Sequence, residues 1–248
     1  MKNNIYNDIL TVVVPTHNRI DLLYKCISSI KHIFPTIKII IGDNSSTDYP
    51  DITMFNNDSS ITVINTRKHE GNIYIAYKSI IEKSKTKYTL IVEDDDMLIN
   101  AKLHYRIIDI IKNNTAVISF AGITDTNEKT LYNKYSGNFF NIPSFWNGEF
   151  QFGLCYYPTN ELLHAINTWF NYDPVNTIDG TFDEAIALLT IQNIKKYYHI
   201  PEIGERIYTN TNNMSWNNPK HRIFSHCKYI DHLTQLLHMS NKWNLIYK

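Results

Sequence analysis

One stretch, residues 88–98 (YTLIVEDDDML), constrains the fold more than any other part of the chain. Five residues of strand character run directly into four carboxylates, Glu93, Asp94, Asp95 and Asp96. Unpaired buried carboxylates are very costly, so we expect this strand to end at a surface or cleft with the acids at its carboxyl tip. In open α/β sheets, that tip is where ligands bind.

The four acids are also candidates for a cation site. Adjacent carboxylates repel one another, and a cation relieves that repulsion. Oxygen ligands on a short loop suit Mn²⁺ or Mg²⁺, above all when substrate phosphates complete the coordination shell. An acidic turn that is merely solvated remains the alternative for the acids alone, but the apolar strand before them favours a metal site.

Apolar strands alternate with amphipathic helices through the first 120 residues. Strands are expected at residues 10–14, 37–41, 61–64, 88–92 and 116–120, and helices between Asp21 and Pro35, at 73–83 and at 101–112. The continuous β-branched runs are typical of strands that are covered on both faces. The alternation predicts a Rossmann-like α/β fold, in which a mostly parallel mixed sheet has helices on both faces.

Beyond about residue 124 this pattern loosens. We expect helices at residues 161–170 and 182–194 and short strands at 197–200 and 206–208. A last amphipathic segment at 219–239 is expected to be helical, and basic residues lie near it. This terminal helix either packs on the domain or forms a basic surface that touches a membrane.

Composition excludes several classes of protein. Lys+Arg and Asp+Glu balance at 24 each, so no global field attracts nucleic acid. The three cysteines form no closely spaced pair, which argues against a zinc site or a disulfide framework and favours a reducing, cytoplasmic compartment. No apolar run approaches the roughly 18 residues needed to span a bilayer. Any membrane contact is therefore expected to be peripheral, at the inner face of the plasma membrane.

Three motifs in order resemble those of glycosyltransferase family 2. They are VVVPTHNR at residues 12–19, DNSSTD at 43–48 and IVEDDDML at 91–98, each at the end of an apolar strand. The resemblance extends over roughly residues 10–112. It implies an A-type fold, a nucleotide-sugar donor and a Mn²⁺ or Mg²⁺ cofactor.

The resemblance also implies roles for individual residues. The first two loops would hold the nucleoside, Gly71 would let the backbone approach the donor, and Asp95 and Asp96 would bind the metal. The donor-binding candidates are Pro15, Thr16, His17, Arg19, Asp43, Asn44, Gly71, Glu93 and Asp94. His17 stands where the family more often has Tyr, and Glu93 stands where it usually has Asp.

Asp183 and Glu184 are the candidates for the catalytic base. The family usually has a Glu-Asp pair at the start of such a helix, and here the order is reversed. The segment NTNNMS at residues 210–215 occupies the place of a family pattern that reaches the diphosphate. The alternative is that both acids only favour the helix N-terminus, where negative charge is stabilised.

The resemblance implies one A-type domain at residues 1–218, with a nucleotide-sugar half (1–120) and an acceptor half (121–218), before a C-terminal helical segment (219–248). It implies an inverting hexosyl- or N-acetylhexosaminyltransferase that uses a UDP-sugar and a free or lipid-linked saccharide acceptor in bacterial surface polysaccharide synthesis such as O-antigen or capsule. Two alternatives stay open: a non-catalytic module that binds a nucleotide sugar, and a nucleotidyltransferase. The latter usually has a Gly-rich loop and a Lys after its first strand, and both are missing from residues 15–18.

Overall fold

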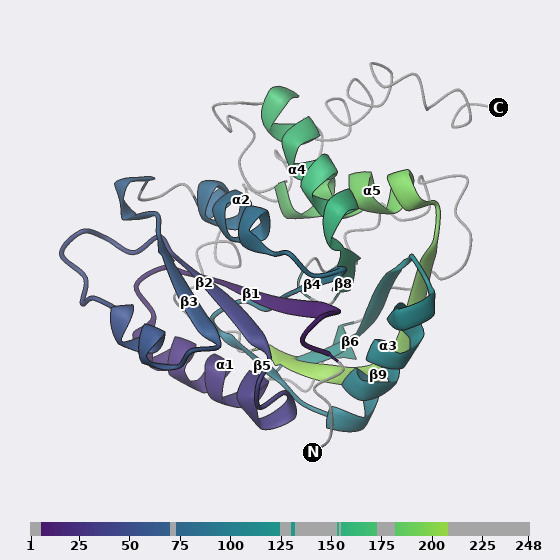
Figure 1. Ribbon diagram of the computed structural model, residues 1–248, viewed down its shortest axis with the longest axis horizontal. Helices are drawn as coiled ribbons and strands as arrows, with labels where there is room; N and C mark the ends of the chain where they lie inside the picture. The colour runs from purple at the N-terminus through teal and green to yellow at the C-terminus, as the bar shows by residue number, and fades with distance from the viewer. Residues whose placement is uncertain are drawn as a thin grey trace.

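The computed structural model describes residues 6–69, 73–124, 130–131, 153, 155–172 and 182–207. Within them, a nine-stranded mixed sheet runs in the order β3-β2-β1-β4-β8-β6-β9-β5, and β7 pairs with β6. Figure 1 shows helices against both faces of this curled sheet. The predicted α/β architecture is therefore confirmed.

The strands are β1 (Leu10–Thr16), β2 (Lys38–Asp43), β3 (Ile61–Asn65), β4 (Tyr88–Ile91), β5 (Asp96–Leu98), β6 (Val117–Thr124), β7 (Thr130–Leu131), β8 (Cys155–Pro158) and β9 (Tyr197–Ile207). The α-helices are α1 (Ile20–Ile33), α2 (Ile73–Lys83), α3 (Ala101–Asn113), α4 (Thr159–Tyr172) and α5 (Phe182–Ile194). Short 3₁₀ turns lie at Thr53–Asn57 and Arg67–His69.

The strands β3, β2, β1 and β4 run parallel to one another. All seven residues of β1 are buried, because helices cover both faces of this central strand. The carboxyl ends of these strands are in register, since Thr16 pairs with Asp43 and Asp43 pairs with Asn65. The loops that follow β1, β2, β3 and β4 consequently meet at one edge of the sheet, where open α/β sheets bind their ligands.

Two apolar layers hold the helices to the sheet. Helices α1 and α3 pack on one face, and α2, α4 and α5 pack on the other. In α1, Leu23, Cys26 and Ile30 recur at helical spacing and are fully buried, so this face of the helix belongs to the core. Helix α2 lies so close to β2 that a Cβ at Gly42 would lie 2.7 Å from Ile80 Cγ2, which explains the glycine before Asp43.

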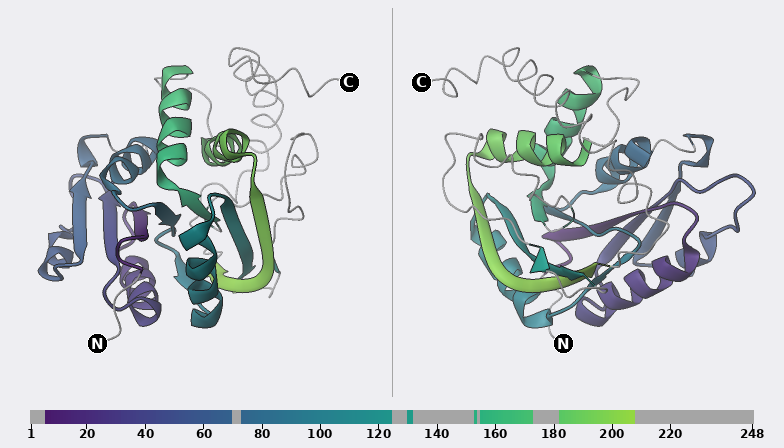
Figure 2. Two further views of the ribbon diagram at one scale, coloured as in Figure 1. Left: turned by 45° about the vertical axis from the view of Figure 1, so that its right-hand side comes forward. Right: turned by 180° about the vertical axis from the view of Figure 1, so that it is seen from behind.

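The second half of the sheet differs from the prediction in detail. Strand β8 inserts antiparallel between β4 and β6, and neither β8 nor the three-residue β5 was expected. The two short strands expected at residues 197–200 and 206–208 are one strand, β9, which Figure 2 shows curling around the sheet. Its register against β6 shifts on both sides of Ala121, so β9 follows a curve that period-2 patterning does not reveal.

Predicted helices at residues 73–83 and 182–194 have the bounds expected for them. No helix in the described ranges combines the length and apolar character needed to cross a membrane. The proposed C-terminal helical segment at 219–248 lies outside the described residues.

Candidate active site

The four acids follow β4 at its carboxyl tip, as expected, but three of them are buried where we expected exposed side chains. Asp94 and Asp95 are each 4% exposed and Asp96 is 5% exposed, whereas Glu93 is partly exposed. The expectation was wrong because it treated these carboxylates as unpaired. Donors from the loop after β1 reach Asp94 and Asp95, and a buried carboxylate is tolerated when it is paired and hydrogen-bonded.

Both carboxylate oxygens of Asp94 accept hydrogen bonds from residues of β1 and the loop after it. Its Oδ2 accepts from the hydroxyl of Thr16 at 2.7 Å and from the backbone N–H of His17 at 3.3 Å. Its Oδ1 accepts from Arg19 Nη1 at 3.1 Å. Burial raises the pKa of Asp94 to about 6, although Arg19 and Thr16 act to lower it. This carboxylate ties the β1–α1 loop to the tip of β4.

Glu93, Asp95 and Asp96 form the cluster that can hold a cation. One carboxylate oxygen from each lies within 4.8 Å of the others. Three oxygen donors at that separation fit Mn²⁺ or Mg²⁺, and a partly exposed Glu93 leaves the cluster accessible from one side. Two of its members are the predicted metal residues Asp95 and Asp96, and Asp95 also pairs with Arg19 Nη1 at 2.6 Å.

Behind Asp96 lies an acid that the sequence did not indicate. Glu205 of β9 is 0% exposed, and its carboxyl group contacts that of Asp96. Burial, together with the neighbouring acid, raises the pKa of Asp96 well above its usual range, and burial raises that of Glu205 to about 8. A single Glu in a strand-like segment indicates a solvent-facing side chain. Only the fold therefore reveals that Glu205 contacts Asp96.

The loops after β1 and β2 interlock through their polar residues. The Nδ1–H of His17 donates to the carbonyl of Asn44 at 2.7 Å. Asn18, in a left-handed conformation with φ of 54°, donates through its backbone N–H to Ser45 Oγ at 3.1 Å. The side chain of Asn18 donates to Ser46 Oγ at 2.8 Å and accepts from the N–H of Ser46 at 2.9 Å. The two loops predicted to hold the nucleoside thus form one connected surface.

Asp43 lies at the end of β2 and is 1% exposed. Its Oδ2 accepts from Arg67 Nε at 2.7 Å and its Oδ1 accepts from the N–H of Ser45 at 3.1 Å. Arg67 also donates to the carbonyls of Tyr49 and Pro50, each at 2.7 Å. Arg67 was not among the predicted site residues. Its position just after β3, next to β2 in the parallel sheet, is the signal that points to this edge.

The structure therefore brings most of the predicted donor and metal residues to one edge of the sheet. These are Pro15, Thr16, His17, Arg19, Asp43, Asn44, Glu93, Asp94, Asp95 and Asp96. Asp183 and Glu184 lie at the start of α5, as expected, but their side chains are outside what the structure describes. Gly71 and the segment 210–215 are outside the described residues.

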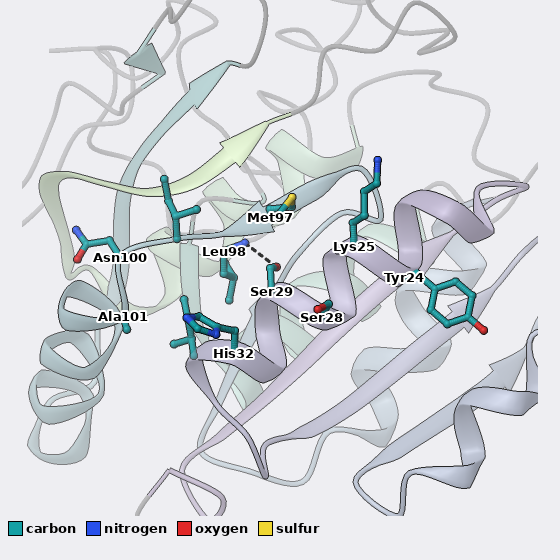
Figure 3. Close-up of a pocket in the computed structure, with 11 residues that line it drawn as sticks. Tyr24, Lys25, Ser28, Ser29, His32, Met97, Leu98, Asn100 and Ala101 are labelled. Atoms are coloured by element: carbon teal, nitrogen blue, oxygen red, sulfur yellow. Dashed lines mark hydrogen bonds between the residues drawn. The ribbon is translucent and has the colours of Figure 1, made fainter.

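A separate hollow of about 810 Å³ lies between α1 and the segment that joins β5 to α3. Figure 3 shows Ser29 on its wall, whose Oγ accepts from the N–H of Leu98 at 3.0 Å. None of the predicted donor, metal or base residues lines it. The candidate site is thus defined by the strand tips and their loops.

Comparisons with known proteins agree with this architecture. The crystal structure of TarS 1–349 from S. aureus superposes with a TM-score of 0.62 at 12% identity, over 81% of this chain and 60% of that one. TarS 1–349 in complex with UDP-GlcNAc superposes with a TM-score of 0.60 at 10% identity, over 85% of this chain and 61% of that one. A crystal structure of TarS with no stated residue range superposes with a TM-score of 0.63 at 13% identity, over 92% of this chain and 42% of that one.

This chain thus spans less than two thirds of the length of these TarS chains. Structural similarity at 10–13% sequence identity supports a conclusion about the fold alone. No curated protein matches the sequence. The sequence profile described as Glycosyl transferase family 2 matches residues 11–175, which is more than half of the chain. The chain therefore belongs to glycosyltransferase family 2 and has the A-type fold.

Proposed function

We propose that this glycosyltransferase moves one sugar from a UDP-sugar to a hydroxyl group of a saccharide acceptor. The observation that carries the proposal is the meeting of the β1, β2 and β4 tips, which places the Asp43 loop beside the acids of the cation cluster. TarS, which shares the fold, has been solved with UDP and with UDP-GlcNAc, and this supports a uridine diphosphate donor.

The loops after β1 and β2 would hold the nucleoside. Pro15 and His17 border the base pocket, and Asp43 accepts from the pyrimidine N–H. The bonds from Arg67 and Ser45 occupy only part of the acceptor capacity of Asp43, because a carboxylate has about four lone-pair positions. Arg67 holds Asp43 in place, so the carboxylate is oriented before the donor arrives.

Asp95 and Asp96, with Glu93 beside them, would hold Mn²⁺ or Mg²⁺. The bound cation would neutralise the negative charge of the diphosphate leaving group. Asp94 and Arg19 keep the β1–α1 loop against these acids, so that the nucleoside and cation parts of the site stay in a fixed relation.

The acceptor hydroxyl must lose its proton as it attacks the anomeric carbon. Glu184, or Asp183 beside it, accepts that proton, and a single displacement inverts the anomeric centre. Both residues stand in the first turn of α5. A positioned carboxylate typically contributes 10²–10⁴-fold to such a step.

The setting that fits this chemistry is the synthesis of a bacterial surface polysaccharide. The acceptor is a free or lipid-linked saccharide, and the enzyme works in the cytoplasm, with peripheral contact at the plasma membrane. Residues 1–120 form the nucleotide-sugar half, residues 121–218 form the acceptor half, and residues 219–248 form a helical segment.

A panel of nucleotide sugars with Mn²⁺ tests the proposal. A donor at a hundred times its Kd stabilises the folded protein by about 2.7 kcal/mol, which raises its melting temperature. Donor hydrolysis or transfer in the presence of saccharides, followed as released UDP, should be abolished by EDTA and restored by Mn²⁺. Binding of a UDP-sugar without any turnover would instead identify a non-catalytic module. Unchanged activity in excess chelator would overturn the cation site.

A further inference from the structure

Glu205 is a buried carboxyl group that the proposed reaction does not use. It is 0% exposed, and neither of its oxygens receives a hydrogen bond from an N–H or O–H donor in the described part of the chain. Its neighbour is the carboxyl group of Asp96. A lone buried carboxyl without a partner costs several kcal/mol, so the burial of Glu205 calls for an explanation.

The backbone around Glu205 is held in an irregular conformation that turns the side chain towards Asp96. In the pairing of β6 with β9, Ala121 faces Ile203 and Gly122 faces Glu205, so Gly204 is an inserted residue. A Cβ at Gly204 would lie 2.6 Å from the ring of Phe120, and only glycine fits without displacing that ring. Bulges of this kind redirect a side chain next to an active site.

The carbonyl of Gly204 is fixed by two donors. The backbone N–H of Ile99 donates to it at 2.7 Å, and the buried His104 donates through Nε2 at 2.9 Å. The other ring nitrogen of His104 accepts from the hydroxyl of Tyr156 at 2.6 Å. Strand β5, which begins at Asp96, therefore lies in a defined position against the strand that carries Glu205.

The pairing of β5 with β9 places Glu205 beside Asp96, because Asp96 pairs with Ile207 and Leu98 pairs with Glu205, so both acids lie on the same face of the paired strands. We propose that Glu205 is a positioning residue whose carboxyl group hydrogen-bonds Asp96 and fixes the oxygen that Asp96 presents to the cation. Glu205 is not one of the three acids whose oxygens lie within 4.8 Å of one another, so it acts through Asp96. The inference rests on the proposed role of Asp96 in cation binding.

Groups that hydrogen-bond a metal ligand orient it, and their loss typically weakens metal affinity by 10–100-fold. Two substitutions at position 205 distinguish a hydrogen bond to Asp96 from an effect of the charge of Glu205. A glutamine at position 205 keeps a donor for Asp96, whereas a leucine has a similar size and no donor. Glu202 supplies a matched control on the same strand, because it is exposed and pairs with Arg106 at 2.6 Å.

The experiment is calorimetric titration of the full chain with Mn²⁺ alone, without nucleotide. We expect Glu205→Gln and Glu202→Gln to keep the Mn²⁺ Kd within about threefold of wild type, and Glu205→Leu to weaken it at least tenfold. Circular dichroism and melting temperature establish that each variant is folded. If Glu205→Leu does not fold, Glu205→Ala, which also lacks a donor for Asp96, takes its place and is expected to weaken the Mn²⁺ Kd at least tenfold.

Three results overturn the inference. A folded Glu205→Leu with the wild-type Kd shows that Asp96 does not depend on Glu205. A folded Glu205→Gln that loses at least tenfold shows that the cation needs the charge of Glu205 rather than its hydrogen bond. Wild-type protein that fails to bind Mn²⁺ at all would instead overturn the proposed cation site, and the inference with it.

Discussion

Nη1 of Arg19 lies 2.6 Å from Oδ2 of Asp95 and 3.1 Å from Oδ1 of Asp94. Asp95 thus has a cationic partner in the protein itself, in addition to the divalent cation proposed for the cluster. Arg19 comes from the loop after β1 and the two acids come from the tip of β4. This contact therefore couples the nucleoside loop to the cation cluster.

Replacing Arg19 by Gln is expected to tighten the binding of Mn²⁺ in the absence of donor. The substitution removes a positive charge beside the cation and a competitor for Asp95, so the Mn²⁺ Kd should fall by about threefold to tenfold, or roughly 1 kcal/mol. Calorimetry with Mn²⁺ alone measures this change. Weaker Mn²⁺ binding by the variant would show that Arg19 orients Asp95 for the cation instead of competing with it.

Substitution of the proposed metal ligands should affect turnover far more than folding. Asp95→Ala and Asp96→Ala are each expected to lower kcat at least a hundredfold, since a bound cation contributes several kcal/mol and each 1.4 kcal/mol is a factor of ten. Steady-state release of UDP at saturating Mn²⁺ checks this. Asp58→Ala, at an exposed acid far from the cluster in sequence, is the control and should keep its kcat. Near-normal kcat in both ligand variants would place the cation elsewhere.

Asp43→Ala is expected to weaken donor binding while leaving Mn²⁺ binding intact. The carboxylate stands at the tip of β2 beside the loop after β1, and it is separate from the three acids of the cation cluster. Donor titration and Mn²⁺ titration, run separately by calorimetry, distinguish the two effects. A donor Kd equal to that of wild type would remove Asp43 from the nucleoside site.

The parallel half of the sheet could be predicted because its strands are buried on both faces and read as continuous apolar runs. The burial of Asp94 and Asp95 could not be predicted. Their main partner, Arg19, is 75 and 76 residues away in sequence, and nothing local indicates that it reaches them. An acid that is costly when unpaired becomes tolerable once a distant donor is brought to it, so the expected surface position was wrong for a physical reason.

The same limit applies to the second half of the sheet. Strand β8 inserts between β4 and β6, far from both in sequence, and its tyrosines are buried by tertiary packing. The placement of Glu205 depends on a bulge at Gly204 and on the ring of Phe120. Such contacts arise from register between strands, which one chain's periodicity does not specify. The positions of the motifs at the strand tips could therefore be predicted, whereas the burial and the partners of their acids could not.

His104 makes the stability of the fold depend on pH. It is fully buried, and burial lowers its pKa from 6.5 to about 4. Between those pH values the unfolded chain binds a proton at this residue and the folded chain does not. The contribution of His104 to the free energy of unfolding is therefore fully present above about pH 6.5 and is lost as the pH falls towards 4. The loss amounts to roughly 3 kcal/mol.

Urea denaturation at several pH values between 7.5 and 4 measures this dependence. His104→Phe, which keeps an aromatic ring of similar size, should be less stable at pH 7.5 because it loses the bonds to Tyr156 and Gly204. Its free energy of unfolding should then fall less steeply between pH 6.5 and 4 than that of wild type. Equal slopes for both proteins would contradict the assignment.

The last prediction concerns the catalytic base at the start of α5. Glu184→Gln should leave donor and Mn²⁺ binding unchanged and lower transfer at least about a hundredfold, because the acceptor hydroxyl loses its proton acceptor. Asp183→Asn, its matched neighbour in the same helical turn, should be milder. Single-turnover transfer, measured beside donor and Mn²⁺ affinities, separates the chemical step from binding.

The reverse ranking of the two variants would assign the role of catalytic base to Asp183. If the two acids serve only the helix N-terminus, each substitution would cost about 0.3–1 kcal/mol of stability with kcat retained, and Asp179 would be the next residue to test.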